Sequence, residues 1–97
     1  MSYHKVEPKK LLLSFPQMQK TLESFPATED TFSSSDALRA WAAESSAGDS
    51  AAHIINLVCA VIDGGYSSGD FGLFEAMSKW DASNKEAFKN WLNLAFP

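Results

Sequence analysis

His53 and Asn56 are the residues whose types and spacing come nearest to a chemical site. They lie three positions apart, so a helix would place them one turn apart, and Asp63 continues the same stripe. Imidazole titrates near neutral pH and serves as a general base or a metal ligand in many proteins. The sequence offers His53 no partner, because the other histidine, His4, lies near the start of the chain. We therefore favour a solvent-facing edge or an internal hydrogen-bond site for this stripe.

Cys59 is the one cysteine of the chain, and it stands between Val58 and Ala60. A nucleophilic cysteine needs a nearby base or cation that lowers its pKa, and neither is close in the sequence. Cysteine is also among the residue types most often buried, so we predict a small core side chain. A single cysteine excludes an internal disulfide and is typical of proteins in a reducing cytoplasm.

The segment Asp63–Asp70, with the sequence DGGYSSGD, suggests an ion-binding or phosphate-binding loop, but its spacing fits neither. Counted from Asp63 as a calcium loop, the sixth position is Ser68 instead of glycine and the twelfth is Phe74 instead of glutamate. A phosphate-binding loop would need a lysine at a spacing that is absent here, and the flanking acids would repel phosphate. We interpret the segment as a turn between two helices, with Tyr66 as a recognition anchor at its tip.

Carboxylates are spread along the chain without forming a catalytic or metal-binding cluster. None of the acids from Glu29 to Asp81 pairs with another at a spacing of three or four within a well-defined helical pattern. Neither a general acid–base pair nor a metal site can therefore be built from spacing, and we predict no metal and no cofactor. Most of these acids are expected to form a solvated negative face. Several stand at helix starts, where the helix dipole stabilises a carboxylate.

The charge of the chain is divided unevenly between its start and the rest. The length of 97 residues and the 45% hydrophobic content indicate one globular domain. Residues 1–20 carry four lysines and one glutamate, net +3, whereas residues 21–97 carry four cations and eleven carboxylates, net −7. A body of that sign repels nucleic-acid phosphates and anionic lipids, so we expect a soluble, cytoplasmic protein that binds neither. Basic surfaces on other proteins are its natural electrostatic partners.

The elements that position these residues are organised around Ala51–Ile62, AAHIINLVCAVI, the one long apolar run in the chain. Its apolar residues recur with the period of a helix and cover most of the helix circumference. We predict a buried central helix over about residues 50–63, with His53, Asn56 and Asp63 on a narrow polar seam. Its most apolar part, Ile54–Ile62, contains Asn56 and is roughly half as long as the ~20 residues that a membrane-spanning helix requires.

Two further helices are predicted before the central one. A proline at the first position suits a helix over Pro16–Ser24, whereas the burst Lys9–Ser14 fits either a helical turn or an edge strand. Ser33 or Ser35 can cap a helix over Asp36–Ser45 after a polar loop. The inward side chains of this part are expected to be Met18, Leu22, Phe25, Leu38, Trp41 and Ala42, with Arg39 and Glu44 in solvent.

Two helices are also predicted after the central one. Asp70 can cap a helix that includes Gly72, and Ser83–Glu86 has the pattern of a capping box for the last helix. Helical spacing places most of the large apolar side chains of this region in the core: Leu73, Phe74, Met77, Trp80, Phe88 and Trp91. Phe71 and Phe96 are the aromatic residues left for a partner.

These patterns predict an all-α fold, a compact bundle of about five short helices around the buried central helix. The whole chain, 1–97, forms one helical domain in which residues 1–8 fray. We predict a non-enzymatic protein–protein interaction module, in its sharper form an acidic inhibitor or decoy that binds a basic surface on its target. The residues predicted to contact the partner are Asp63, Tyr66, Asp70, Phe71 and Glu75.

Two alternative functions remain open. One is a small-ligand binder or enzyme with a pocket near His53 and Asn56, in which His53 should face a cavity with at least two other polar groups. The other is a self-associating structural domain with a symmetric apolar interface.

Overall fold

Six α-helices and one short 3-10 helix make up the described part of the chain, residues 4–45, 49–64 and 71–97, in the computed structural model. In chain order they are α1 (Pro8–Ser14), α2 (Pro16–Ser24), the 3-10 helix η1 (Glu29–Phe32), α3 (Ser35–Ser45), α4 (Asp49–Ile62), α5 (Leu73–Lys79) and α6 (Ala82–Ala95). No strand occurs in these residues. The Cα radius of gyration is 12.4 Å, close to the value of about 13 Å for a compact domain of this size. The predicted all-α bundle is confirmed.

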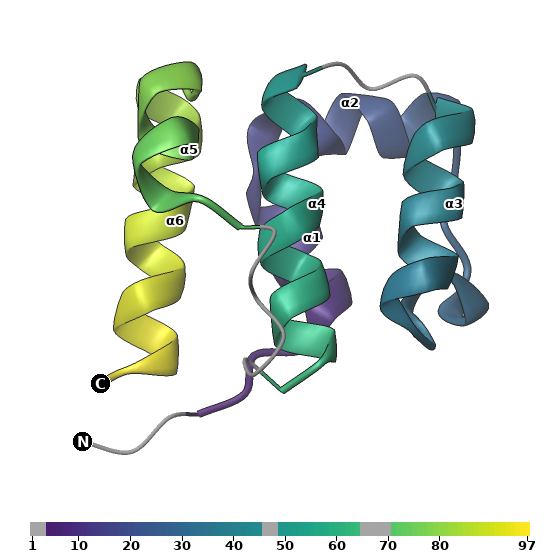
Figure 1. Cartoon of the computed structure of the whole chain (residues 1–97), viewed down its shortest axis with the longest axis horizontal. Coiled ribbons are helices and arrows are strands. Elements are labelled where there is room, and N and C mark those ends of the chain that lie inside the picture. Colours follow the sequence, from purple (N-terminus) through teal and green to yellow (C-terminus); the bar gives the residue numbers. More distant parts are fainter. Residues whose placement is uncertain (1–3, 46–48, 65–70) are drawn as a thin grey trace.

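Helix α4 lies at the centre of the bundle, as its apolar sequence predicts. It contacts α1, α3 and α5, and Figure 1 shows it between α3 on one side and the α5–α6 pair on the other. Ala51, Ile54, Val58 and Val61 are each no more than 2% exposed. Burying an aliphatic side chain of this size stabilises a fold by about 1.5–3 kcal/mol, which is why this helix is enclosed by its neighbours.

The apolar segment Lys9–Ser14 belongs to helix α1. Of the two predicted alternatives, a helical turn or an edge strand, the helix is therefore correct. Leu11 and Leu12 are buried, at 1% and 0% exposure. Phe15, also 0% exposed, ends α1 and precedes α2 with extended backbone angles, φ −86° and ψ 118°. The proline that follows Phe15 disfavours a helical conformation for it and then suits the first turn of α2. One buried residue therefore joins two helices of different direction (Figure 1).

The N-terminus of α3 is capped by a serine that the sequence analysis did not select. Ser34 Oγ accepts a hydrogen bond from Ala37 N at 3.1 Å. A side-chain oxygen at this position satisfies one of the amides that the first turn of a helix leaves unpaired. The predicted caps, Ser33 and Ser35, are therefore each wrong by one residue.

Trp41 attaches α3 to the segment that follows α2. Its indole Nε1 donates a hydrogen bond to Phe25 O at 3.2 Å, and the two rings stack with centroids 5.9 Å apart. The segment predicted as a loop between these residues contains η1, which begins with a capping box between Thr28 and Thr31. Thr28 N donates to Thr31 Oγ1 at 3.1 Å in that box.

The starts of α5 and α6 also differ from the prediction. Gly72 is the N-cap of α5 instead of lying within the helix, and the predicted cap, Asp70, lies outside the described residues. Asp81 caps α6, because its Oδ1 accepts a hydrogen bond from Asn84 N at 2.9 Å. The predicted capping box at Ser83–Glu86 is wrong, since Asp81 meets the free amides of the first turn two residues earlier.

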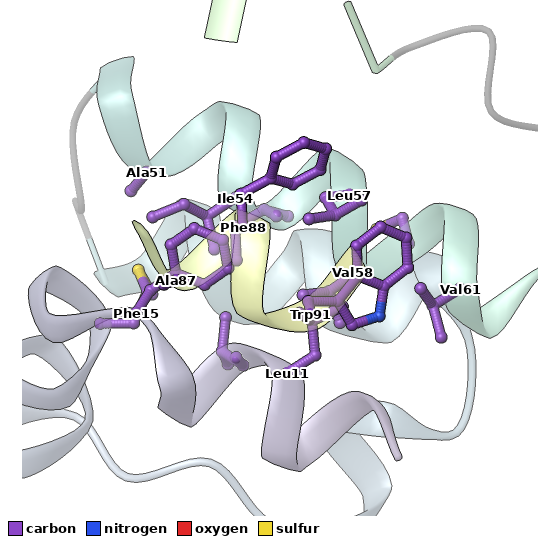
Figure 2. Close-up of a cluster of buried hydrophobic side chains, with 14 of the residues drawn as sticks. Leu11, Phe15, Ala51, Ile54, Leu57, Val58, Val61, Ala87, Phe88 and Trp91 are labelled. Carbon is purple, nitrogen blue, oxygen red and sulfur yellow. The ribbon is translucent and has the colours of Figure 1, made fainter. Parts of the chain in front are cut away.

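Aromatic rings join α1, α5 and α6 on one side of the core. Trp80, directly after α5, contacts Phe15 with ring centroids 5.3 Å apart and Phe88 with centroids 5.6 Å apart. Trp91 continues the series from Phe88 at 5.7 Å. Figure 2 shows Phe15, Phe88 and Trp91 gathered with apolar side chains of α1 and α4 in one cluster. Trp80, Phe88 and Trp91 are buried, as their helical spacing predicts.

Candidate functional site

Helix α5 exposes two large apolar side chains at its N-terminal end. Phe74 is 89% exposed and Leu73 is 46% exposed. The other side of the helix is buried, with Ala76 at 0% and Trp80, directly after the helix, at 3%. Glu75 is exposed as well. We call Leu73, Phe74 and Glu75 the α5 surface.

The prediction that Leu73 and Phe74 face the core is wrong. Helix α5 has seven residues, and the burial of Ala76 sets its rotation where it packs on α4. Phe74 precedes Ala76 by two residues, which places it about 160° around the helix axis. A helix that turns Ala76 inward must therefore turn Phe74 outward. Leu73, only about 60° from Ala76 by the same geometry, is correspondingly less exposed.

Phe71, predicted to be free for a partner, packs against the aromatic cluster. It is partly buried, and its ring centroid lies 6.2 Å from that of Trp80 and 6.1 Å from that of Phe88. Phe96 is 43% exposed and rests edge-on against Trp91 at 6.3 Å. The roles of Phe71 and Phe74 are therefore exchanged relative to the prediction, because Phe71 covers the cluster and Phe74 projects from it.

The predicted acidic contact residues are found at the surface where the structure describes them. Glu75 is exposed in the first turn of α5, where the helix dipole favours a carboxylate. Asp63 is exposed directly after α4, and its Oδ1 accepts a hydrogen bond from Ser35 Oγ at 3.2 Å. Tyr66 and Asp70 lie outside the described residues.

A cavity of about 280 Å³ lies between α3 and α4, and Asn56 is one of its polar lining residues. The other polar one is Arg39, whose Nη1 donates a hydrogen bond to Asn56 Oδ1 at 2.7 Å. The remaining lining side chains are apolar and mostly small: Ala42, Ala43, Ala51, Ala52 and Ile55. The prediction that Arg39 faces solvent is wrong, because the amide of the adjacent helix supplies an acceptor that holds it partly buried.

The polar seam of α4 does not converge on one site. His53 does not line the cavity beside Asn56. It is partly buried, and its Nδ1 makes no hydrogen bond within the described part of the protein. Asn56 is directed to Arg39 on α3 and Asp63 to the start of α3. Asn56 and Asp63 therefore have different partners, and no general base with an orienting carboxylate is assembled from the three seam residues in the described part of the chain.

Cys59 is a core side chain, as predicted. It is 2% exposed, and its Sγ donates to Ser35 O at 3.7 Å. Burial of this degree keeps the sulfur away from a substrate in solution. In the same described ranges, no group of three or more His, Cys, Asp or Glu side chains is placed to hold a metal ion.

The exposure of Phe74 is the feature that sequence reasoning missed. Leu73 and Phe74 were predicted to face the core because only the helical spacing of large apolar side chains was considered. Ala76, a small apolar residue in the middle of the helix, was the available signal for the face that packs closely on a neighbour. An alanine allows a neighbouring helix to approach closely, and in α5 the buried side is the side of Ala76.

Among the helices of residues 4–45, 49–64 and 71–97, none has the length and apolar character needed to cross a membrane. Comparisons of the chain with family models, curated proteins and solved structures found no match, so its function has to be inferred from the features of its own surface.

Proposed function

We propose that this chain is a non-enzymatic interaction module that binds a basic surface of another protein through the α5 surface. The observation that carries the proposal is Phe74, which is 89% exposed on a helix held in place by buried Ala76 and Trp80. Burying a phenylalanine side chain contributes about 1.5–3 kcal/mol of stabilisation, and this contribution is absent while Phe74 is exposed in the isolated chain. A partner that covers Phe74 gains it.

The way in which Phe74 is presented suits recognition. Aromatic side chains are enriched at the centres of protein interfaces, where they fill pockets on the partner. Phe74 belongs to a helix, so little backbone freedom is lost when it binds. Leu73 beside it adds a second apolar contact, and Glu75 adds a charge at the rim.

Charge determines which partners fit this surface. Residues 21–97 carry a net charge of −7 and include Asp63 and Glu75, which are both exposed. Such a body attracts basic protein surfaces and speeds their association at low ionic strength. In its sharper form the proposal is an acidic inhibitor or decoy that covers a nucleic-acid site on a cytoplasmic target, with its carboxylates in place of phosphates.

The test compares variants in affinity capture from the source organism, followed by titration of the captured protein after its separate expression. Phe74→Ala should weaken binding at least tenfold, because a buried aromatic anchor is lost. Glu75→Lys should weaken binding less. The wild-type affinity should fall as salt rises from about 50 to about 300 mM, because this change shortens the Debye length about 2.4-fold.

Leu94→Ala is the matched control, since Leu94 is 64% exposed on α6, outside the α5 surface. It should bind as the wild type does. Capture of the same proteins by wild type and Phe74→Ala with equal affinity would remove the α5 surface from the proposal.

The cavity between α3 and α4 favours one second candidate, a small-ligand binder. Its volume of about 280 Å³ is near the lower end of ligand pockets, and a guanidinium beside alanine side chains suits a short-chain carboxylate. We rank this candidate second because Asn56 already accepts a hydrogen bond from Arg39. Titration with butyrate, followed by NMR, should shift the amide signals of α3 and α4 if this function is correct.

A further inference from the structure

A second apolar hollow lies away from the α5 surface, between α1, the end of α2 and η1. Its volume is about 150 Å³. A dry protein cavity of about this volume holds one benzene molecule, so the hollow has the size of a single phenyl ring. Its lining residues are Lys9, Leu13, Leu22, Pro26, Ala27 and Phe32. We call them the α1–η1 pocket.

The charges around the α1–η1 pocket favour an aromatic side chain that has a carboxylate next to it, on the side of Lys9. Lys9 is exposed in the pocket wall and is the one charged residue among those that line it. An adjoining hollow shares Lys9 and Phe32 with the pocket, but it also contains Glu7 and Glu29. A carboxylate of the occupant must therefore lie beside Lys9 and away from these two acids.

The chain itself contains a segment of that description. Phe74 is almost fully exposed, and the next residue is the exposed Glu75. Within one copy the segment is far from the pocket, since α5 lies at one end of the long axis and α3, which η1 contacts, lies at the other (Figure 1). We propose that the chain self-associates head to tail, with Phe74 of one copy in the α1–η1 pocket of the next and Glu75 beside Lys9.

This contact differs from the symmetric interface considered for a self-associating domain. It joins two different surfaces, so each pair of copies retains one free Phe74 and one free pocket, and the assembly grows with concentration. One aromatic anchor buries less area than a standard interface, so the association is weak. It rests on the same Phe74 as the proposed function, and a basic partner would compete with the second copy for it.

The test uses two complementary variants whose masses are followed by sedimentation velocity up to about 1 mM, a range that reaches weak association. Phe74→Ala keeps the pocket and lacks the aromatic anchor. Leu13→Asp keeps the anchor and places a carboxylate at the pocket mouth, where Leu13 is 40% exposed. The wild type should grow in mass with concentration, and each variant alone should stay monomeric. Their equimolar mixture should form a one-to-one dimer that grows no further.

A charge exchange tests the orientation without depending on Leu13→Asp. Lys9→Glu and Glu75→Lys should each weaken self-association about two- to fivefold, and the double variant should recover the wild-type value. Far-ultraviolet circular dichroism verifies that each variant is folded, and Leu94→Ala should associate as the wild type does.

Three results would overturn the inference: a monomeric wild type at every concentration, self-association of Phe74→Ala equal to wild type, or a mixture that fails to dimerise. A monomeric wild type would leave the proposed function in place, because capture of an external partner is measured separately. Failure of the wild type to capture any partner, together with intact head-to-tail association, would reject the proposed function and keep this inference.

Discussion

Replacement of Phe15 and of Phe74 by alanine should separate the residue that holds the fold from the residue that binds. The two substitutions remove the same atoms. Phe15 is 0% exposed, joins α1 to α2 and contacts the Trp80 ring at 5.3 Å, whereas Phe74 is 89% exposed. A large-to-small change at a buried phenylalanine costs about 3–5 kcal/mol, of which the lost aromatic pair accounts for about 0.5–1.5 kcal/mol. The change at Phe74 should alter the free energy of unfolding by about 0.5 kcal/mol or less.

Urea denaturation followed by tryptophan fluorescence measures both changes. A domain of this length has a free energy of unfolding of about 5–15 kcal/mol, so Phe15→Ala should remove a large part of it. With a urea m-value of about 1.5 kcal/mol/M, the midpoint for Phe15→Ala should fall by about 2–3 M, and the midpoint for Phe74→Ala should hardly move. A destabilisation by Phe74→Ala comparable with that of Phe15→Ala would refute the reasoning, because Phe74 would then pack against the protein and α5 would have a different rotation.

Three further predictions concern local interactions. Asp81→Ala should lower the free energy of unfolding by about 1 kcal/mol through loss of the α6 cap, whereas Ser83→Ala should change it by less than about 0.5 kcal/mol in the same urea assay. Asn56→Ala should cost about 1.5 kcal/mol, because the partly buried guanidinium of Arg39 loses its hydrogen bond of 2.7 Å to Asn56 Oδ1; an unchanged unfolding midpoint would contradict that role. Cys59 should react with a thiol reagent only on opening of the core, so its modification rate should rise with urea, and rapid modification of the native protein would disprove its burial.

Much of the architecture follows from short-range rules. Most of the run Ala51–Ile62 had to be enclosed, because a helix with that sequence is apolar over most of its circumference and has only a narrow polar seam. Pro16 ends one helix and begins another, since a proline restricts the residue before it and lacks the amide that a helix interior needs. The fold class, the central helix and the burial of Cys59 were predictable for these reasons. The burst Lys9–Ser14 was too short for its period to distinguish a helix from a strand.

The candidate binding features depend instead on how the elements pack. Arg39 approaches Asn56 only because α3 and α4 lie side by side, and the sequence separates these residues by 17 positions. The α1–η1 pocket combines side chains from α1, α2 and η1 with Pro26 and Ala27 from the chain that joins α2 to η1, and no local pattern connects them. The cap of α3 depends on packing in the same way. Ser33, Ser34 and Ser35 are equally suited by residue type to cap a helix, and the position at which the packed helix begins makes Ser34 the cap.

The amino-acid sequence by itself determined that this protein is a bundle of helices around α4, because hydrophobic periodicity over a long run specifies both a helix and its burial. It also determined the charge division between the basic start and the acidic remainder. Only the tertiary structure decided which side of α5 faces outward. A helix of seven residues has about two turns, too few for its period to define a face, so the close packing of Ala76 turned Phe74 into solvent.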